Sequence, residues 1–184
     1  MKKNLLAATI VLFIFISVTG CGSNTHDTQV QTVPVDSSKK VSDTIGETKE
    51  NLKECFSLIG RDDESAALLL GGGKESIAAD GVTPIGRTYT VQLFGEKTEI
   101  GTLYDENGRV SIITVELKDP DASVYSDKLK ELYGEPTEMN DKMSEGGATW
   151  EAWDIEEIQL RLYQQYELST IEIVGLSDVN ATRN

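Results

Sequence analysis

The sequence predicts an α+β protein in which a helical hairpin packs on an antiparallel sheet. Three observations lead to this fold class. Apolar residues recur with helical spacing up to about residue 70, and after about residue 86 they alternate with polar residues. In addition, two segments about 60 residues apart resemble each other. This similarity indicates two tandem units, each a helix followed by three or four strands, which share one core because neither could bury its sheet face alone.

The helical hairpin is expected at the start of the first unit. Thr44 and Glu47 have the spacing of a capping box, which predicts a helix that ends near Gly60. Asp62 is a favourable N-cap for a second, shorter helix, which Gly71-Gly72-Gly73 ends. These glycines do not fit a phosphate-binding loop, because a helix rather than a strand precedes them.

Strands follow the second helix. The stretch RTYTVQLFG, from Arg87, alternates apolar and polar residues. The stretch KTEIGTLYDENGRVSIITVEL, from Lys97, predicts a hairpin whose turn is Asn107-Gly108. The acidic residues beside this turn do not indicate a calcium loop, which needs about twice the length and a distal glutamate.

The second unit is predicted to begin with a helix that starts at Asp119-Pro120-Asp121 and ends at Gly134. The apolar stripe of this helix consists of Val124, Leu129, Leu132 and Tyr133. Three strand-like runs follow: GATWEAWDI, EIQLRLYQ and LSTIEIVGL.

The internal similarity lies between two hairpins. TLYDENGRVSIITVEL, from Thr102, aligns without gaps with RLYQQYELSTIEIVGL, from Arg161. The identical pairs are Leu103/Leu162, Tyr104/Tyr163, Ile112/Ile171, Val115/Val174 and Leu117/Leu176. Upstream, LLLGG and ELYGE place a glycine at the same point of a helix end. A true repeat explains these matches, and chance similarity between β-rich segments is the alternative.

The N-terminus has the features of a secretory signal peptide. Met1-Lys2-Lys3 is basic, and the apolar run from Leu5 to Val18 is too short to span a membrane as a helix. The residues that follow, VTGC, resemble the lipobox of bacterial lipoproteins. This resemblance implies that the leader is removed, that Cys21 carries a diacylglycerol with palmitate-type chains, and that Cys21 becomes the mature N-terminus. The alternative is an ordinary signal peptide whose cleavage site lies near a cysteine by coincidence.

The resemblance also implies a location. The protein would be lipid-anchored to the cell membrane or the outer membrane, facing the extracytoplasmic side. A polar stretch without helical periodicity follows Cys21 and is expected to act as a flexible tether. His26 lies in this tether, where no rigid frame would support a catalytic imidazole. Cys55 shares a helical face with Leu52 and Ile59, so we expect it to be a core residue rather than a nucleophile.

These patterns divide the chain into five parts. They are a signal peptide (1–20), a flexible tether (21–42), a first α/β unit (43–118), a second α/β unit (119–178) and a polar tail (179–184).

The body, from Asp43 to Ser177, looks like the tandem fold of the β-lactamase inhibitor protein. It is also similar to small envelope lipoproteins of the outer-membrane assembly type. What this architectural resemblance implies is a binding module that presents a sheet face to other proteins. The extra helix of the first unit departs from a strict tandem repeat.

The net charge of the chain indicates which classes of partner it can bind. The formal net charge is −14, so phosphate-rich nucleic acid and anionic lipid surfaces would be repelled. We expect no cofactor and no metal site. The acidity favours solubility, and it also suits a cation or a basic partner.

Four aromatic residues are the candidate contact residues for a protein partner: Trp150, Trp153, Tyr163 and Tyr166. Because Trp150 and Trp153 are three residues apart, a strand would point them to opposite faces, and only one would reach the outer surface. The alternative is that all four cover the core.

The sequence thus predicts a membrane-anchored lipoprotein that binds a protein partner and is not an enzyme. The alternative function is a carboxylate-dependent hydrolase of the cell envelope, and Glu151 with Asp154 is the best carboxylate pair for it. A solute-capture lipoprotein would need two larger lobes than this chain can form.

Overall fold

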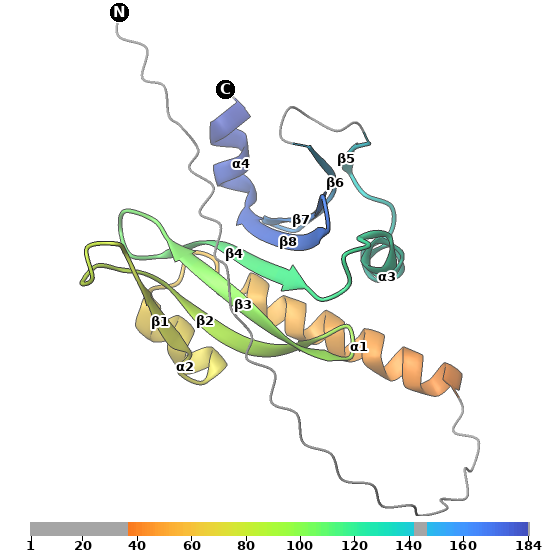
Figure 1. Ribbon diagram of the computed structural model, residues 1–184, viewed down its shortest axis with the longest axis horizontal. Coiled ribbons are helices and arrows are strands. Elements are labelled where there is room, and N and C mark those ends of the chain that lie inside the picture. Colours follow the sequence, from red (N-terminus) through yellow and green to blue (C-terminus); the bar gives the residue numbers. More distant parts are fainter. Residues whose placement is uncertain (1–36, 142–146, 184) are drawn as a thin grey trace, which may run out of the picture. The chain divides into compact units, whose positions relative to one another are not determined.

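The computed structural model describes residues 37–141 and 147–183. These residues form an α+β fold of four helices and one antiparallel sheet of eight strands (Figure 1). The elements are α1 (Ser37–Phe56), α2 (Asp63–Leu70), β1 (Lys74–Ile77), β2 (Pro84–Leu93), β3 (Glu96–Tyr104), β4 (Val110–Leu117), α3 (Ser123–Tyr133), β5 (Glu138–Asn140), β6 (Ala148–Ile155), β7 (Ile158–Gln165), β8 (Leu168–Gly175) and α4 (Leu176–Arg183). The predicted fold class is confirmed. Residues 35–184 form one compact unit, so the two predicted α/β units are halves of a single body.

The strand order is β1-β2-β3-β4-β8-β7-β6-β5. Each half of the sheet is therefore a four-stranded meander, and the two meanders join where β4 pairs with β8. We call β1–β4 the first meander and β5–β8 the second meander. This order is symmetric about the β4–β8 contact, as expected for two copies of one unit.

The strand registers carry the same repeat. Leu103 pairs with Ile112 across β3 and β4, and their counterparts Leu162 and Ile171 pair across β7 and β8. The pairing is thus the same in both hairpins, but the faces differ: Leu103 is 37% exposed, whereas Leu162 and Ile171 are buried in the core. The ungapped alignment therefore does not place the aligned residues on the same face of the sheet. The hairpin turn at Asn107-Gly108, predicted between β3 and β4, is also present, and Gly108 has a φ of 74°.

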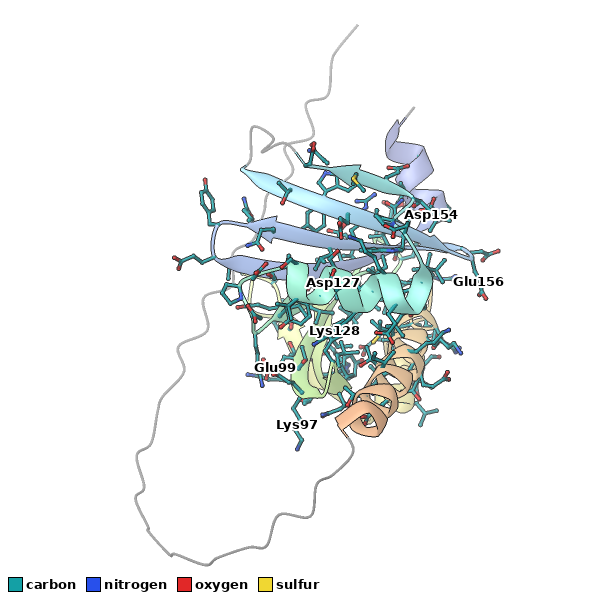
Figure 2. All side chains as sticks on the ribbon, turned by 90° about the vertical axis from the view of Figure 1, so that its right-hand side faces the viewer. Lys97, Glu99, Asp127, Lys128, Asp154 and Glu156 are labelled. Carbon is teal, nitrogen blue, oxygen red and sulfur yellow. The ribbon has the colours of Figure 1, made fainter. Side chains whose placement is uncertain are left out.

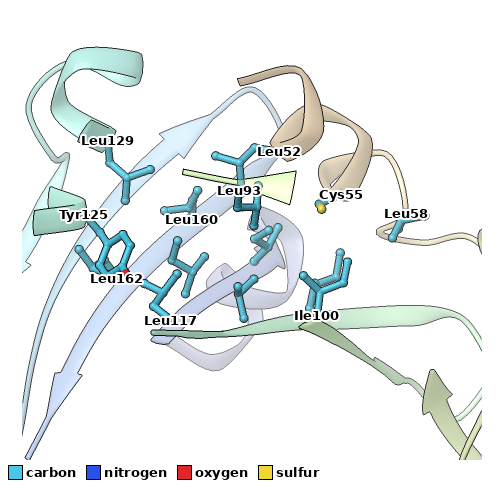
Figure 3. Packing of buried hydrophobic residues seen from close by; sticks show 14 of the residues in the cluster. Leu52, Cys55, Leu58, Leu93, Ile100, Leu117, Tyr125, Leu129, Leu160 and Leu162 are labelled. Carbon is cyan, nitrogen blue, oxygen red and sulfur yellow. The ribbon is translucent and has the colours of Figure 1, made fainter. Parts of the chain in front are cut away.

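One face of the sheet, which we call the inner face, packs against helices α1 and α3. The core between them draws on both meanders, as Figure 3 shows for Ile100 and Leu117 of the first and Leu160 and Leu162 of the second. The two halves therefore share one core, because buried residues of both meanders belong to a single cluster with residues of α1 and α3.

Cys55 is fully buried in this core and has a free thiol, as predicted. Burial raises its pKa to about 12, so the thiol stays protonated and unreactive in the folded protein. The predicted start of α1 is wrong, because the helix begins at Ser37 and Thr44 lies inside it. No glycine or proline lies between Ser37 and Thr44, and Lys39 and Lys40 favour helix, so nothing stops the helix from extending toward the N-terminus. Residues 37–42 therefore belong to the body and not to the tether.

Helix α2 is capped as expected. The Asp62 carboxylate accepts a hydrogen bond from the Ser65 backbone N–H at 2.8 Å, and Gly71 ends the helix with a φ of 81°. A bidentate ion pair between Asp63 and Arg87, at 2.6 and 2.7 Å, fixes α2 to strand β2. This guanidinium holds the pKa of the Asp63 carboxyl below its usual range.

Helix α3 ends at Gly134 as predicted, but it begins at Ser123, after the predicted start at Asp119-Pro120-Asp121, and its buried face differs. Val124 is exposed, whereas Tyr125, Ser126 and Leu129 are buried. The physical reason is that Tyr125 and Leu129, four residues apart, align toward the sheet and turn Val124 away from it. Ser126 is tolerated there because it donates a hydrogen bond to the carboxylate of Glu151.

The predicted polar tail is wrong for residues 179–183, because α4 covers Leu176–Arg183. Val179 is buried, and α4 packs against β7 and β8. In the part of the chain that the structure describes, no helix is both long and apolar enough to cross a membrane. The predicted signal peptide, Cys21 and His26 lie outside the described residues.

Candidate binding surface

Strand β6 separates the two tryptophans, as its alternation requires. Trp153 points into the core and is only 1% exposed, and its indole N–H donates a hydrogen bond to the Gly134 carbonyl at 2.8 Å. Trp150, three residues earlier, points to the opposite face and is half-buried. Trp150 therefore belongs to the sheet face that α1 and α3 do not cover.

Trp150 has an aromatic neighbour on that face. It pairs directly with Tyr163 of β7, and on its other side it pairs with Asn140 of the edge strand β5. Directly opposed side chains on antiparallel strands are about 5 Å apart at their Cβ atoms, so the two aromatic side chains are neighbours on this face. Burial raises the pKa of the Tyr163 hydroxyl, and the negative charge of Glu172 raises it further. Tyr163 is thus a neutral, partly desolvated aromatic side chain at all physiological pH values.

A chain of polar side chains continues from this pair along the same face. Arg161 donates hydrogen bonds to Glu172 on β8 at 3.2 Å and to the side-chain oxygen of Gln159. Gln159 in turn donates to the carboxylate of Asp154 at 2.7 Å. These contacts tie β6, β7 and β8 together and hold their outward side chains in fixed positions.

We call the surface formed by Trp150, Asp154, Arg161, Tyr163 and Glu172 the open face. Helix α4 packs next to the Asp154 end of this surface, where Gln159 and Val174 are buried. The aromatic pair lies toward the other end, near the β7–β8 turn. The end of the open face that carries Trp150 and Tyr163 is therefore the end away from α4.

Tyr166 lies beyond that end, at the first position of the two-residue turn between β7 and β8. Its side chain is 76% exposed, and its backbone φ of 53° is in the left-handed region. A non-glycine residue in this region costs about 1–2 kcal/mol. Phe94 and Glu156 have the same backbone conformation at the first position of the β2–β3 and β6–β7 turns, so it is a property of these two-residue turns.

Three of the four predicted contact residues thus lie at one end of the second meander: Trp150, Tyr163 and Tyr166. The prediction is wrong for Trp153, which is enclosed in the core and cannot reach a partner. Sequence reasoning missed Arg161 and Glu172. A signal for Arg161 existed, because it is the sole basic residue in the four strands of the second meander.

The carboxylate pair considered for a hydrolase does not come together. Glu151 faces α3, where it accepts hydrogen bonds from Ser126 and from Lys130, the latter at 3.2 Å. Asp154, three residues later on the same strand, lies on the open face. The sheet separates the two carboxylates, so they cannot act on one bond.

A second candidate region surrounds Phe94, which lies between two hollows of about 360 and 310 Å³ near α1 and α3. The ammonium group of Lys128 lies 5.5 Å from the ring centroids of both Phe94 and Tyr125. The backbone N–H of Phe94 donates to the Thr48 hydroxyl at 2.8 Å, which fixes the β2–β3 turn against α1. These contacts give Phe94 a packing role, and the charges around the hollows are of both signs.

No family model matches the chain, and no curated protein matches it either. Among solved structures, the chain is similar to the crystal structure of a DUF4309 family protein (YjgB) from Bacillus subtilis. The identity is 8% and the TM-score is 0.48, over 74% of this chain and 99% of that chain. A likeness of this size concerns the arrangement of helices and strands, and it does not extend to what either protein binds.

Proposed function

We propose that this protein is a membrane-anchored lipoprotein of the bacterial cell envelope that binds a protein partner through its open face and is not an enzyme. The observation that carries this proposal is the Trp150–Tyr163 pair on a sheet face that neither α1 nor α3 covers. Tryptophan and tyrosine are the residues most enriched among energetically important interface contacts.

The arrangement around the pair also favours binding. The hydrogen bonds that join Asp154, Gln159, Arg161 and Glu172 order the polar side chains before a partner arrives. Such preorganisation lowers the entropic cost of association. Tyr166 adds an exposed aromatic ring at the tip of the adjacent turn.

The anchor rests on the lipobox resemblance of VTGC. Residues 22–36 would link the acylated Cys21 to the first turn of α1. Fifteen residues reach about 50 Å when fully extended, so the body could lie clear of the lipid headgroups. The predicted tether is shortened by the six residues that α1 includes.

Crosslinking in cells tests the binding proposal. The full chain, tagged after Asn184, is crosslinked and purified, and the co-purified proteins are compared with those of Trp150→Ala and Tyr166→Ser. Leu68→Ser is the matched control, because Leu68 on α2 is 86% exposed and distant in the sequence from the open face. We expect one discrete adduct that both Trp150→Ala and Tyr166→Ser lose and the control keeps. An adduct that all three variants keep would refute the assignment of the surface.

Membrane fractionation tests the anchor separately. Cys21→Ser should move the protein from the membrane fraction to the soluble fraction, because the acyl chains would be lost. Retention of Cys21→Ser in the membrane fraction would exclude the lipid anchor without affecting the binding proposal.

A further inference from the structure

The second meander is strongly acidic. Arg161 is the only basic residue in strands β5–β8, and its charge is taken up by the ion pair with Glu172 at 3.2 Å. The two-residue turns at the ends of β7 carry further acids, Glu156 and Glu157 at one end and Glu167 at the other. The open face is thus bordered by negative charge at both ends.

Four carboxylates on or beside the open face are available to a partner. Asp154, Glu156, Glu157 and Glu167 are all exposed, and none of them forms an ion pair with a described residue. Asp154 and Glu156 project at the same end of the sheet (Figure 2). Within the described residues, no three acidic, histidine or cysteine side chains are close enough to hold a metal ion. Three of the four carboxylates thus lie at the β6–β7 turn end of the open face, and Glu167 lies at the aromatic end.

We propose that the open face binds an extended protein segment rich in arginine or lysine, an inference that rests on the proposed binding function. One cationic side chain of the segment would stack on the rings of Trp150 and Tyr163. Contacts of this kind between a cation and an aromatic face contribute about 0.5–2 kcal/mol. Further cationic side chains would meet the four exposed carboxylates.

Charge complementarity selects this partner over others. Nucleic acids and anionic membranes carry the same sign as the open face and are repelled by it. A single metal ion would leave the aromatic pair without a role. The cationic side chains of a basic segment could contact both the aromatic rings and the exposed carboxylates. The attraction between the opposite charges would also speed association at low salt.

The dimensions of the surface define a probe. Strand β7, Ile158–Gln165, has eight residues and so separates the acidic turns by about 26 Å. An extended peptide of eight residues has about the same length. The probe is a fluorescein-labelled peptide of four Arg-Ser repeats, and a peptide of four Glu-Ser repeats is the charge-reversed control.

Binding is measured by fluorescence anisotropy with the full chain, tagged after Asn184 and extracted in a non-ionic detergent. One variant neutralises the open face by Asp154→Asn, Glu156→Gln, Glu157→Gln and Glu167→Gln. The matched control removes four exposed charges elsewhere by Glu47→Gln, Glu54→Gln, Glu106→Gln and Asp127→Asn. Both variants have the same net charge, so a difference between them reports position and not total charge.

At about 20 mM salt we expect the open-face variant to bind the Arg-Ser peptide at least about 10-fold more weakly, and the control variant to change by less than about 3-fold. Trp150→Ala should weaken binding by about 2- to 5-fold, as expected for one lost stacking contact. Equal losses in the two charge variants, or equal binding of the Glu-Ser peptide, would overturn the proposal. If the cellular adduct described above is lost in Trp150→Ala but kept in the open-face charge variant, the protein-binding function stands and the basic partner is excluded.

Discussion

The two tryptophans should respond oppositely to substitution, because they lie on opposite faces of one strand. Trp153→Ala removes a fully enclosed side chain and leaves the Gly134 carbonyl at the end of α3 without its donor. Deleting a buried aromatic costs about 3–5 kcal/mol. We therefore expect a loss of about 3–5 kcal/mol in the free energy of unfolding. Trp150→Ala, on the half-buried side, should cost at most about 2 kcal/mol.

Urea unfolding of the body, residues 35–184, measures both values, since this unit contains the entire described core. Total stabilities of such domains are about 5–15 kcal/mol, so Trp153→Ala could be unfolded even without urea. Trp153→Phe keeps most of the ring volume and provides a folded comparison, with an expected loss of about 2 kcal/mol. Acrylamide quenching of the single-tryptophan variants Trp150→Phe and Trp153→Phe reports exposure independently. Equal destabilisation by the two alanine variants, or equal quenching, would refute the assignment of faces.

Three further outcomes follow from the core and the first meander. Gly86→Ala should destabilise the body by more than about 2 kcal/mol in urea, because a Cβ there would lie 1.7 Å from the Thr102 carbonyl oxygen; an unchanged midpoint would contradict the close approach of β2 and β3. Asp63→Asn should cost about 1 kcal/mol at pH 7, since the ion pair with Arg87 is partly exposed. Because the folded-state pKa of Asp63 is lowered, its stabilisation is present above the unfolded pKa of about 3.9 and is lost as pH falls through the folded value. A difference between wild type and Asp63→Asn that grows toward pH 3 would contradict this. In a chain whose other cysteine is serine, Cys55 should react with a thiol reagent at pH 8 only on unfolding; rapid labelling of the folded protein would show that the thiol is not buried.

Local signals in the sequence were sufficient for most elements. Gly71 and Gly134 follow the helices they end, and Asn107-Gly108 forms the turn between β3 and β4. Gly71, Gly108 and Gly134 each have a positive φ, which glycine adopts without steric cost. The two similar segments form hairpins with the same pairing, although the aligned apolar residues Leu103 and Leu162 lie on opposite faces of the sheet.

The elements that sequence reasoning missed are those held by tertiary contacts. Strands β1 and β5 are three or four residues long and lie at the edges of the sheet, so they carry no alternating pattern. Helix α4 is polar except for the contact that Val179 makes. The N-terminal turns of α1 lack a sequence signal that distinguishes them from a polar linker.

The candidate site was partly predictable. Strand alternation alone separates Trp150 from Trp153, and the same argument separates Glu151 from Asp154, which excludes them as a catalytic pair. The pairing of Trp150 with Tyr163 depends on the register of β6 and β7, which a turn of Glu156-Glu157 sets. Neither glycine nor asparagine marks that turn, so the sequence offers no direct signal for it.

Site-specific photocrosslinking tests the central claim, that the aromatic end of the open face contacts a protein partner. A benzoylphenylalanine residue is placed at position 163, 166 or 68 of the full chain in living cells, position 68 being the exposed control on α2. We predict a discrete crosslinked species from positions 163 and 166 and none from position 68. Crosslinks from position 68 alone, or the same species from all three positions, would contradict the account.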